Sequence, residues 1–206
     1  INCECGKETS FTAAKSYMAQ VLILMLIVAY LSGEEMLIRQ IEKSPEIISA
    51  CMDRTIEEQI KNSIPLFRNA RDILILARGF DFAVAQETEL KIMEASYTNA
   101  KAYSSCDYPH GPFATTDRFS PAVFFLADSY TDESTVQLLE KMKRDFKISA
   151  LVVTNKEKYR DLGEAVVMLP EEAEGIPGIF GLIVFSQLFS CLLAISRGYN
   201  PDEPLG

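Results

Sequence analysis

The sequence predicts an α/β protein built on a doubly wound (flavodoxin-like), five-stranded parallel sheet flanked by helices. From Asp72 onward, short and almost continuously apolar runs alternate with helical patterns. Such runs are typical of parallel strands that are buried on both faces. The chain of 206 residues is long enough for one core with additional helices, and its 48% apolar and 24% charged content is typical of globular proteins.

The part of the chain before the sheet is predicted to be helical. Thr12–Leu31 forms one helix, whose apolar run Val21–Leu31 is shorter than the ~18–20 apolar residues of a membrane span. We therefore expect a helix buried between other elements. Residues 34–71 are predicted to form two or three amphipathic helices, broken before Pro45 and Pro65, that pack as a connector on the sheet.

Strands and helices then alternate to the end of the chain. The predicted strands are Ile73–Ala77, Ala100–Ser104, Pro121–Ala127, Ser149–Thr154 and Ala165–Leu169. The predicted helices are Phe82–Tyr97, a helix capped by Thr131 and followed by acids in its first turn, and Pro177–Arg197. The last helix is almost wholly apolar, but Gln187 and three serines interrupt it, so we expect it to be buried in the protein.

Charge and cysteine content exclude several classes of function. The net charge is −9 and the sequence has no basic cluster, which argues against nucleic-acid binding. Five cysteines without framework spacing predict no disulfide and no metal site, and hence a reducing cytoplasm. The first ten residues are not a signal peptide, and both ends of the sequence suggest a piece of a longer protein.

Ionisable residues gather around the second predicted strand. Glu87, Lys91 and Glu94 have the spacing i, i+4, i+7 and share one helix face. Arg78-Gly79 and the loop with His110, the single histidine, both follow strands and are expected at the edge where doubly wound sheets bind ligands. An acid, a base and a cation near one strand end suit proton transfer on a small polar substrate. The structural alternative is a solvated ion pair and a surface histidine.

These motifs resemble the sugar-isomerase (SIS) domain family, which includes the isomerase domains of glucosamine-6-phosphate synthases and related deaminases and deglycases. The resemblance rests on Arg78-Gly79, on the helix from Glu87 to Tyr97 and on His110-Gly111-Pro112, with Glu8–Lys15 and the segment from Gly198 as supporting matches. It covers essentially the whole chain. It implies four parts: the end of a first SIS domain (1–33), connecting helices (34–71), a second SIS domain (72–197) and the start of a C-terminal tail (198–206).

The resemblance also implies roles for individual residues. Glu94 corresponds to the carboxylate that moves a proton between C1 and C2 of an open-chain sugar phosphate, and His110 to the residue that opens the sugar ring. Glu87, Lys91, Arg78 and Gly79 correspond to substrate-binding positions. The family needs no cofactor for this chemistry. Its histidine reaches the active site of the neighbouring subunit, which implies a homodimer.

The sequence also departs from the family pattern. The family's phosphate-binding Ser-x-Ser-Gly-x-Thr loop is absent here; it belongs to the first SIS domain, most of which is expected upstream of Ile1. Gln86, Thr88 and Cys106 replace residues usual in the synthases, and these differences favour a deglycase or an amino-sugar-phosphate deaminase or isomerase over the synthase itself. A sugar-phosphate-binding module without catalysis is the main alternative, and a dimerisation domain is a third. Which sugar phosphate is bound, and whether ammonia, an amino acid or an amino sugar is released, stays open.

Overall fold

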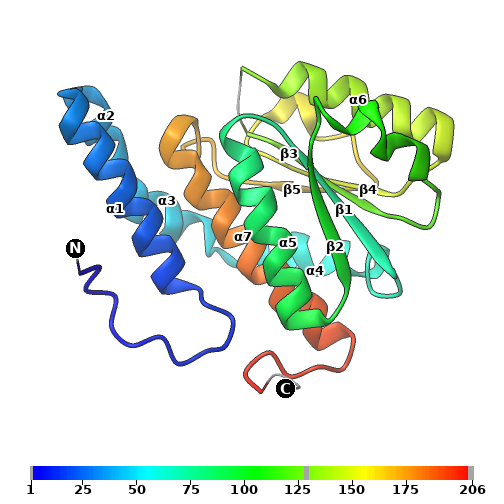
Figure 1. Cartoon of the computed structure of the whole chain (residues 1–206), viewed down its shortest axis with the longest axis horizontal. Helices are drawn as coiled ribbons and strands as arrows, with labels where there is room; N and C mark the ends of the chain where they lie inside the picture. The colour runs from blue at the N-terminus through cyan, green and yellow to red at the C-terminus, as the bar shows by residue number, and fades with distance from the viewer. Residues whose placement is uncertain (1, 128–129, 204–206) are drawn as a thin grey trace.

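The centre of the computed structural model, which describes residues 2–127 and 130–203, is a five-stranded sheet (Figure 1). Its strand order is β2-β1-β3-β4-β5, and every neighbouring pair is parallel. The strands are β1 (Asp72–Ala77), β2 (Asn99–Ser104), β3 (Ala122–Leu126), β4 (Ala150–Thr154) and β5 (Ala165–Met168). The predicted sheet is confirmed, and each observed strand end lies within one residue of the predicted one.

Both faces of the sheet are covered, which explains the continuous apolar character of its strands. In β3, Val123 and Phe125 face one hydrophobic cluster, whereas Ala122, Phe124 and Leu126 face the other. All five side chains are buried, because successive residues of a strand point to opposite faces. The strand therefore has no polar face in its sequence.

Three long helices cover the sheet. Helices α5 (Phe80–Ser96) and α7 (Gly175–Ser196) lie on one face and α6 (Asp132–Phe146) lies on the other (Figure 1). Thr131 precedes α6 at the N-cap position as predicted, but its side chain makes no capping hydrogen bond. The acids of the first turn of α6 are present as expected.

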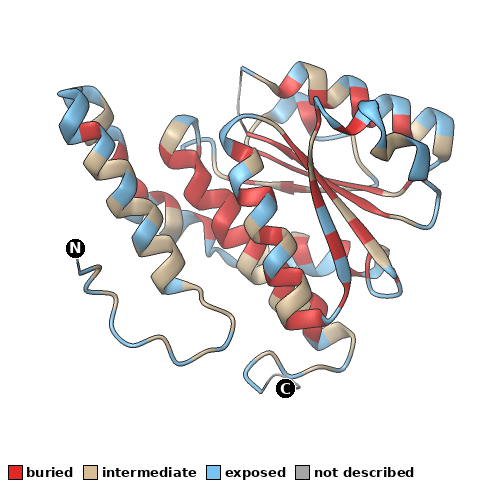
Figure 2. Ribbon diagram, viewed as in Figure 1, coloured by how far each residue is buried: buried red, intermediate tan, exposed pale blue. Residues whose placement is uncertain are grey.

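Helix α7 is the buried helix that the sequence predicted, as Figure 2 shows. The Phe185 ring meets the edge of the Phe125 ring of the sheet, with ring centroids 5.8 Å apart. A buried hydrogen bond of 2.6 Å between the hydroxyls of Thr88 and Ser186 joins α5 to α7. Ser186, one of the polar residues that interrupt the apolar sequence of α7, thus makes a contact inside the protein.

Four helices precede the sheet: α1 (Lys15–Ser32), α2 (Glu35–Ile41), α3 (Ser44–Cys51) and α4 (Arg54–Ser63). Short 3-10 turns are η1 (Ile64–Leu66), η2 (Tyr108–His110), η3 (Pro112–Thr115) and η4 (Glu157–Tyr159). The predicted breaks near Pro45 and Pro65 are confirmed. A further break lies at Asp53, whose carboxylate accepts a hydrogen bond from the Thr55 backbone N–H and caps α4.

The prediction that the first helix is buried is wrong for this chain. Of the residues of α1, all of them described, Ala29 is the one that is buried, and Leu24, Val28 and Leu31 are 63%, 61% and 83% exposed. One side of α1 packs on the main core through residues such as Met25. The helix lies outside the layer of α5 and α7, and no described element covers its outer side (Figures 1 and 2).

Two helices, α1 and α7, are long and apolar enough to cross a membrane by length and composition alone. Core helices of soluble proteins pass the same test, and α7 is largely buried in the protein. The sequence argument that α1 is too short for a span does not hold, because the helix comprises 18 residues. The absence of a membrane span stays a prediction.

Candidate active site

Lys91 of α5 is buried between two carboxylates of the same helix. Its Nζ lies 3.3 Å from Glu87 Oε1 and 2.9 Å from Glu94 Oε2. The side chain of Lys91 is 3% exposed, that of Glu87 12% and that of Glu94 23%. The predicted common helix face is confirmed. This face does not point into solvent, so the arrangement is not the solvated ion pair of the structural alternative.

Burial changes the acid–base properties around this group. It raises the pKa of Glu87 above its ordinary value, an effect that the Lys91 ammonium opposes and the Glu94 carboxylate reinforces. Tyr17 of α1 lies near the Glu87 carboxylate. Burial, and in second place the charge of this carboxylate, raise the pKa of Tyr17 to about 12. The Lys91 ammonium thus forms ion pairs with two carboxyl groups that are largely shielded from water.

A cavity of about 150 Å³ opens beside Lys91. It lies between α5, α7 and the segments at both ends of the described chain. Its lining comprises Ser10, Thr12, Ala14, Lys91, Ala95, Gln187, Ser190, Cys191, Pro201 and Asp202. The sequence prediction included Lys91 alone of these residues. Ala95 is an apolar residue of α5, and the remaining lining residues come from three segments that lie far from α5 in the sequence.

The N-terminal wall of the cavity is fixed by hydrogen bonds. The Glu8 carboxylate accepts bonds from the backbone N–H groups of Ala14 and Ser16 and from the Ser16 hydroxyl, at 2.9–3.3 Å. These bonds, led by the Ser16 backbone N–H, lower the pKa of Glu8. The Gln187 side-chain amide donates to the Ala14 carbonyl at 3.2 Å and ties this segment to α7. The Glu8–Lys15 motif is therefore part of the site region.

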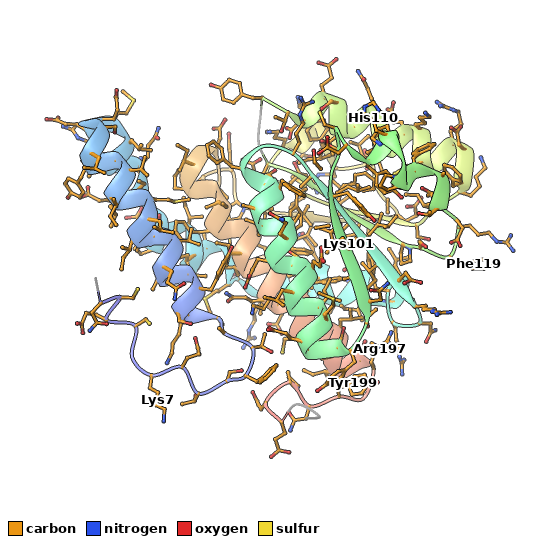
Figure 3. All side chains as sticks on the ribbon, in the orientation of Figure 1. Lys7, Lys101, His110, Phe119, Arg197 and Tyr199 are labelled. Atoms are coloured by element: carbon orange, nitrogen blue, oxygen red, sulfur yellow. The ribbon has the colours of Figure 1, made fainter. Side chains whose placement is uncertain are left out.

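The C-terminal wall is held in a similar way. The rings of Tyr97, at the end of α5, and Tyr199 meet edge to face with centroids 4.8 Å apart. The Arg197 guanidinium donates to the carbonyls of Arg68 and Ala70 at 2.9 and 3.1 Å. Figure 3 shows Arg197 and Tyr199 together at this end of the molecule. Residues after α7 are thereby held against the end of α5.

Arg78 and Gly79 lie at the other end of α5. The Arg78 guanidinium donates to the Ser134 hydroxyl of α6 at 2.8 Å. Gly79 precedes α5 with φ 63° and ψ −137°, a conformation that residues with a Cβ rarely adopt. Both residues follow β1 at the carboxyl edge of the sheet, as predicted, but neither lines the cavity beside Lys91.

His110 is exposed at the end of η2 and does not meet Glu94 within the chain. Figure 3 shows His110 at the opposite end of the molecule from Tyr199, whose ring contacts Tyr97 three residues after Glu94. The expectation that the acid, the base and the cation meet near one strand end is therefore wrong for a single chain. A helix that connects parallel strands runs back along the sheet. Glu94 belongs to the last turn of α5, and at a rise of 1.5 Å per residue it lies about 20 Å along the axis from Phe80.

A second cavity, of about 340 Å³, lies near the N-terminal ends of α5 and α7. Its ionisable carboxyl groups are Asp81 and Glu174, and its lining contains no Lys, Arg or His among the described residues. One Asp81 oxygen accepts the Ala127 backbone N–H at 3.0 Å. Of the predicted site residues, Lys91 lines the first cavity and none lines this second one, so we take the cavity beside Lys91 as the candidate site.

The described residues include five cysteines and no cluster of possible metal ligands. Cys3, Cys5, Cys51, Cys106 and Cys191 are free thiols. Within residues 2–127 and 130–203, no group of three or more His, Cys, Asp or Glu side chains is placed to hold a metal ion. Burial raises the pKa of Cys51 to about 11 and that of Cys191 above its ordinary value, so both thiols stay protonated near neutral pH.

The sequence profile of the SIS domain family matches residues 66–196. A probable glutamine–fructose-6-phosphate aminotransferase (isomerizing) of Schizosaccharomyces pombe is 29% identical over 216 residues, which cover 99% of this chain and 30% of that protein. The chain thus spans less than a third of the length of this curated relative.

Solved structures share the fold. The C-terminal domain of glucosamine-fructose-6-phosphate aminotransferase from Francisella tularensis matches with a TM-score of 0.84 and 21% identity, over 98% of this chain and 58% of that one. A glucosamine-6-phosphate deaminase from Thermotoga maritima matches with a TM-score of 0.69 and 25% identity, over 97% of this chain and 57% of that one.

Proposed function

Because this chain belongs to the SIS domain family, we propose that it is part of an enzyme that acts on a phosphorylated ketose or amino sugar. The observation that carries the proposal is the buried Lys91, held between Glu87 and Glu94 beside a cavity. A structural ion pair needs neither two carboxylates for one ammonium nor a cavity. Two related proteins, a fructose-6-phosphate aminotransferase and a glucosamine-6-phosphate deaminase, indicate the substrate class.

In this proposal Glu94 transfers the proton between C1 and C2 of the open-chain sugar through an enediol or enolamine intermediate. Its side chain is the most exposed of the three, so it is available to a substrate. Lys91 holds both carboxylates in place through its two ion pairs, so that Glu94 is positioned to accept the proton. Glu87 supports Lys91 from the other side and contributes to substrate binding through the ion pair that positions the Lys91 ammonium. No cofactor is needed for this proton transfer.

His110 opens the sugar ring, and it does so in the site of a second subunit. The side chain is exposed on a loop at the far end of the molecule from Glu94, which supports an action between chains. Arg78 and Gly79, at the same edge of the sheet as this loop, take part in substrate binding across the dimer. We place the homodimer in the cytoplasm, without a nucleic-acid or membrane partner.

The domain division given by the family resemblance fits this proposal. Residues 72–197 form the second SIS domain, residues 34–71 connect it to the end of a first SIS domain at 1–33, and residues 198–206 start a C-terminal tail. The cavity beside Lys91 draws its lining from three of these four parts, namely the first, third and fourth. A site of this composition suits an enzyme whose substrate lies between two SIS domains.

The test is turnover by the full-length protein and its Glu94→Gln variant. Each is incubated with fructose 6-phosphate plus ammonia, with glucosamine 6-phosphate and with a fructosamine-type amino-acid 6-phosphate, and products are followed by mass spectrometry. We expect one substrate to turn over and its kcat to fall at least about 100-fold in Glu94→Gln, as for loss of a general base.

Glu89→Gln is the matched control, because Glu89 lies on the same helix but binds Lys101 and the Ala102 backbone N–H. Its kcat should stay within about twofold of the parent, since Gln keeps the hydrogen-bond acceptor. Binding of a sugar phosphate without turnover, equal in the protein and in Glu94→Gln, would instead establish the binding module.

A further inference from the structure

One serine of α7 has a hydroxyl without a partner. Three buried side-chain polar atoms lack a hydrogen bond among the described residues: Asn155 Oδ1, Ser190 Oγ and Arg197 Nε. Ser190 is the one of the three that lines the cavity beside Lys91, and it is 2% exposed. Buried polar groups are almost always satisfied in native proteins, so this hydroxyl calls for an explanation.

Other buried hydroxyls in these helices bond to the carbonyl one turn earlier. Ser186 donates to the Leu182 carbonyl at 2.8 Å, Ser96 to the Ile92 carbonyl at 2.7 Å and Thr88 to the Val84 carbonyl at 2.7 Å. Ser190 follows Ser186 by one turn of the same helix but makes no such bond. Its hydroxyl is available to a group that enters the cavity.

The charges around the cavity restrict what that group can be. Lys91 is the one cation in the lining, and it is already bound by Glu87 and Glu94. Asp202 adds a further carboxyl group to the wall. Because Glu87 and Glu94 already bind the Lys91 ammonium and Asp202 adds a carboxyl group to the lining, the cavity disfavours a phosphate dianion and favours a neutral hydroxyl or an amine.

The neighbouring thiol does not offer a covalent alternative. Burial, and then the Asp202 carboxylate, raise the pKa of Cys191, so the thiol is protonated and a poor nucleophile. The polar chemistry available in the wall beside Lys91 is therefore hydrogen bonding by Ser190, Gln187 and the hydroxyls of the N-terminal segment. Gln187 already donates to the Ala14 carbonyl.

We propose that Ser190 is a substrate-binding residue, whose hydroxyl bonds to a hydroxyl or amino group of the sugar while the phosphate lies outside the cavity. This inference rests on the proposed function, because it assumes that a sugar phosphate enters beside Lys91. Ser190 would then contribute to substrate specificity, because the ligand must carry a hydroxyl or amino group at the carbon that lies against the Ser190 hydroxyl.

The test compares Ser190→Ala with Ser186→Ala in the full-length protein, by thermal unfolding and by calorimetric titration with glucosamine 6-phosphate, fructose 6-phosphate, a fructosamine-type amino-acid 6-phosphate and inorganic phosphate. Ser190→Ala removes a hydroxyl that has no partner, so Tm without ligand should stay equal or rise, while sugar-phosphate affinity falls about three- to tenfold. Ser186→Ala breaks the bond to Thr88, so Tm should fall while affinity stays unchanged. Ser190→Thr keeps the hydroxyl and should bind more tightly than Ser190→Ala.

Three other outcomes would contradict the proposed role of Ser190. Unchanged sugar-phosphate affinity in Ser190→Ala, or a Tm that falls as in Ser186→Ala, would make Ser190 structural and overturn this inference alone. Inorganic phosphate that binds the parent as tightly as the sugar phosphates, and loses affinity in Ser190→Ala, would put the phosphate in the cavity and overturn the assignment. Failure of the parent protein to bind any of glucosamine 6-phosphate, fructose 6-phosphate and a fructosamine-type amino-acid 6-phosphate would overturn the proposed function and this inference together.

Discussion

At the scale of single residues, the charge of Lys91 dominates the candidate site. An ammonium with 3% exposure has lost most of its hydration, and only its two carboxylate partners compensate for that loss. The same sequence spacing occurs in Glu57 and Lys61 of α4, whose side chains are 40% and 51% exposed. Two pairs with identical i, i+4 spacing thus differ in their contribution to stability, because Lys91 is buried and has a second carboxylate partner, Glu94.

This contrast predicts different costs for the same substitution. Lys91→Met leaves two carboxylates facing an apolar side chain, and we expect the free energy of unfolding to fall by about 2–4 kcal/mol. Lys61→Met removes an exposed pair and should cost less than about 0.5 kcal/mol. Urea unfolding of both variants at neutral pH measures the difference. Equal small losses would mean that water already hydrates Lys91 in the folded protein.

At the scale of elements, the packing of α7 against the core depends on two glycines. A Cβ on Gly178 would lie 2.7 Å from the Ala173 carbonyl oxygen, which is backbone and cannot rotate away. A Cβ on Gly181 would lie 3.1 Å from the Cys51 Sγ and 3.3 Å from the Ala173 Cβ, and both of these are side-chain atoms. The first contact fixes the start of α7 against the preceding loop, whereas the second permits small adjustments.

We therefore expect Gly178→Ala to destabilise the protein by about 1–3 kcal/mol through overpacking, although alanine favours helices. Gly181→Ala should cost less, because the neighbouring side chains can shift and alanine gains helix propensity. The measurement is Tm by circular dichroism for both variants. A higher Tm for Gly178→Ala than for the parent would show that the chain between Ala173 and α7 adjusts freely.

At the scale of the whole molecule, the sheet could be predicted from the sequence and the site could be predicted only in part. Strands such as Ala122–Leu126 are apolar at every position, so local pattern and burial agree. The common face of Glu87 and Lys91 also follows from local spacing. The contribution of Ser190 to the cavity depends on how α7 meets α5, the segment before α1 and the C-terminal segment. These segments lie far apart in the sequence, so no local sequence pattern predicts that Ser190 lines the cavity.

The exposure of α1 escaped prediction for the same reason. Its apolar sequence fits a buried helix equally well, and the pattern does not say which segment covers it. The position of His110 relative to Glu94 is also a property of the assembled fold, because a crossover helix carries its last turn to the opposite edge of the sheet.

The separation of His110 from Glu94 predicts complementation between two inactive chains. If His110 serves the site of a second subunit, Glu94→Gln and His110→Ala homodimers are both inactive, whereas a mixed dimer contains one site with both residues intact. Random pairing of equal amounts makes half of the dimers mixed, so co-expression should restore about a quarter of the parent kcat. Differently tagged chains and tandem purification isolate the mixed dimer, whose kcat should then be about half that of the parent. A purified mixed dimer without activity would contradict the action of His110 between chains, because each chain would then need both residues for its own site.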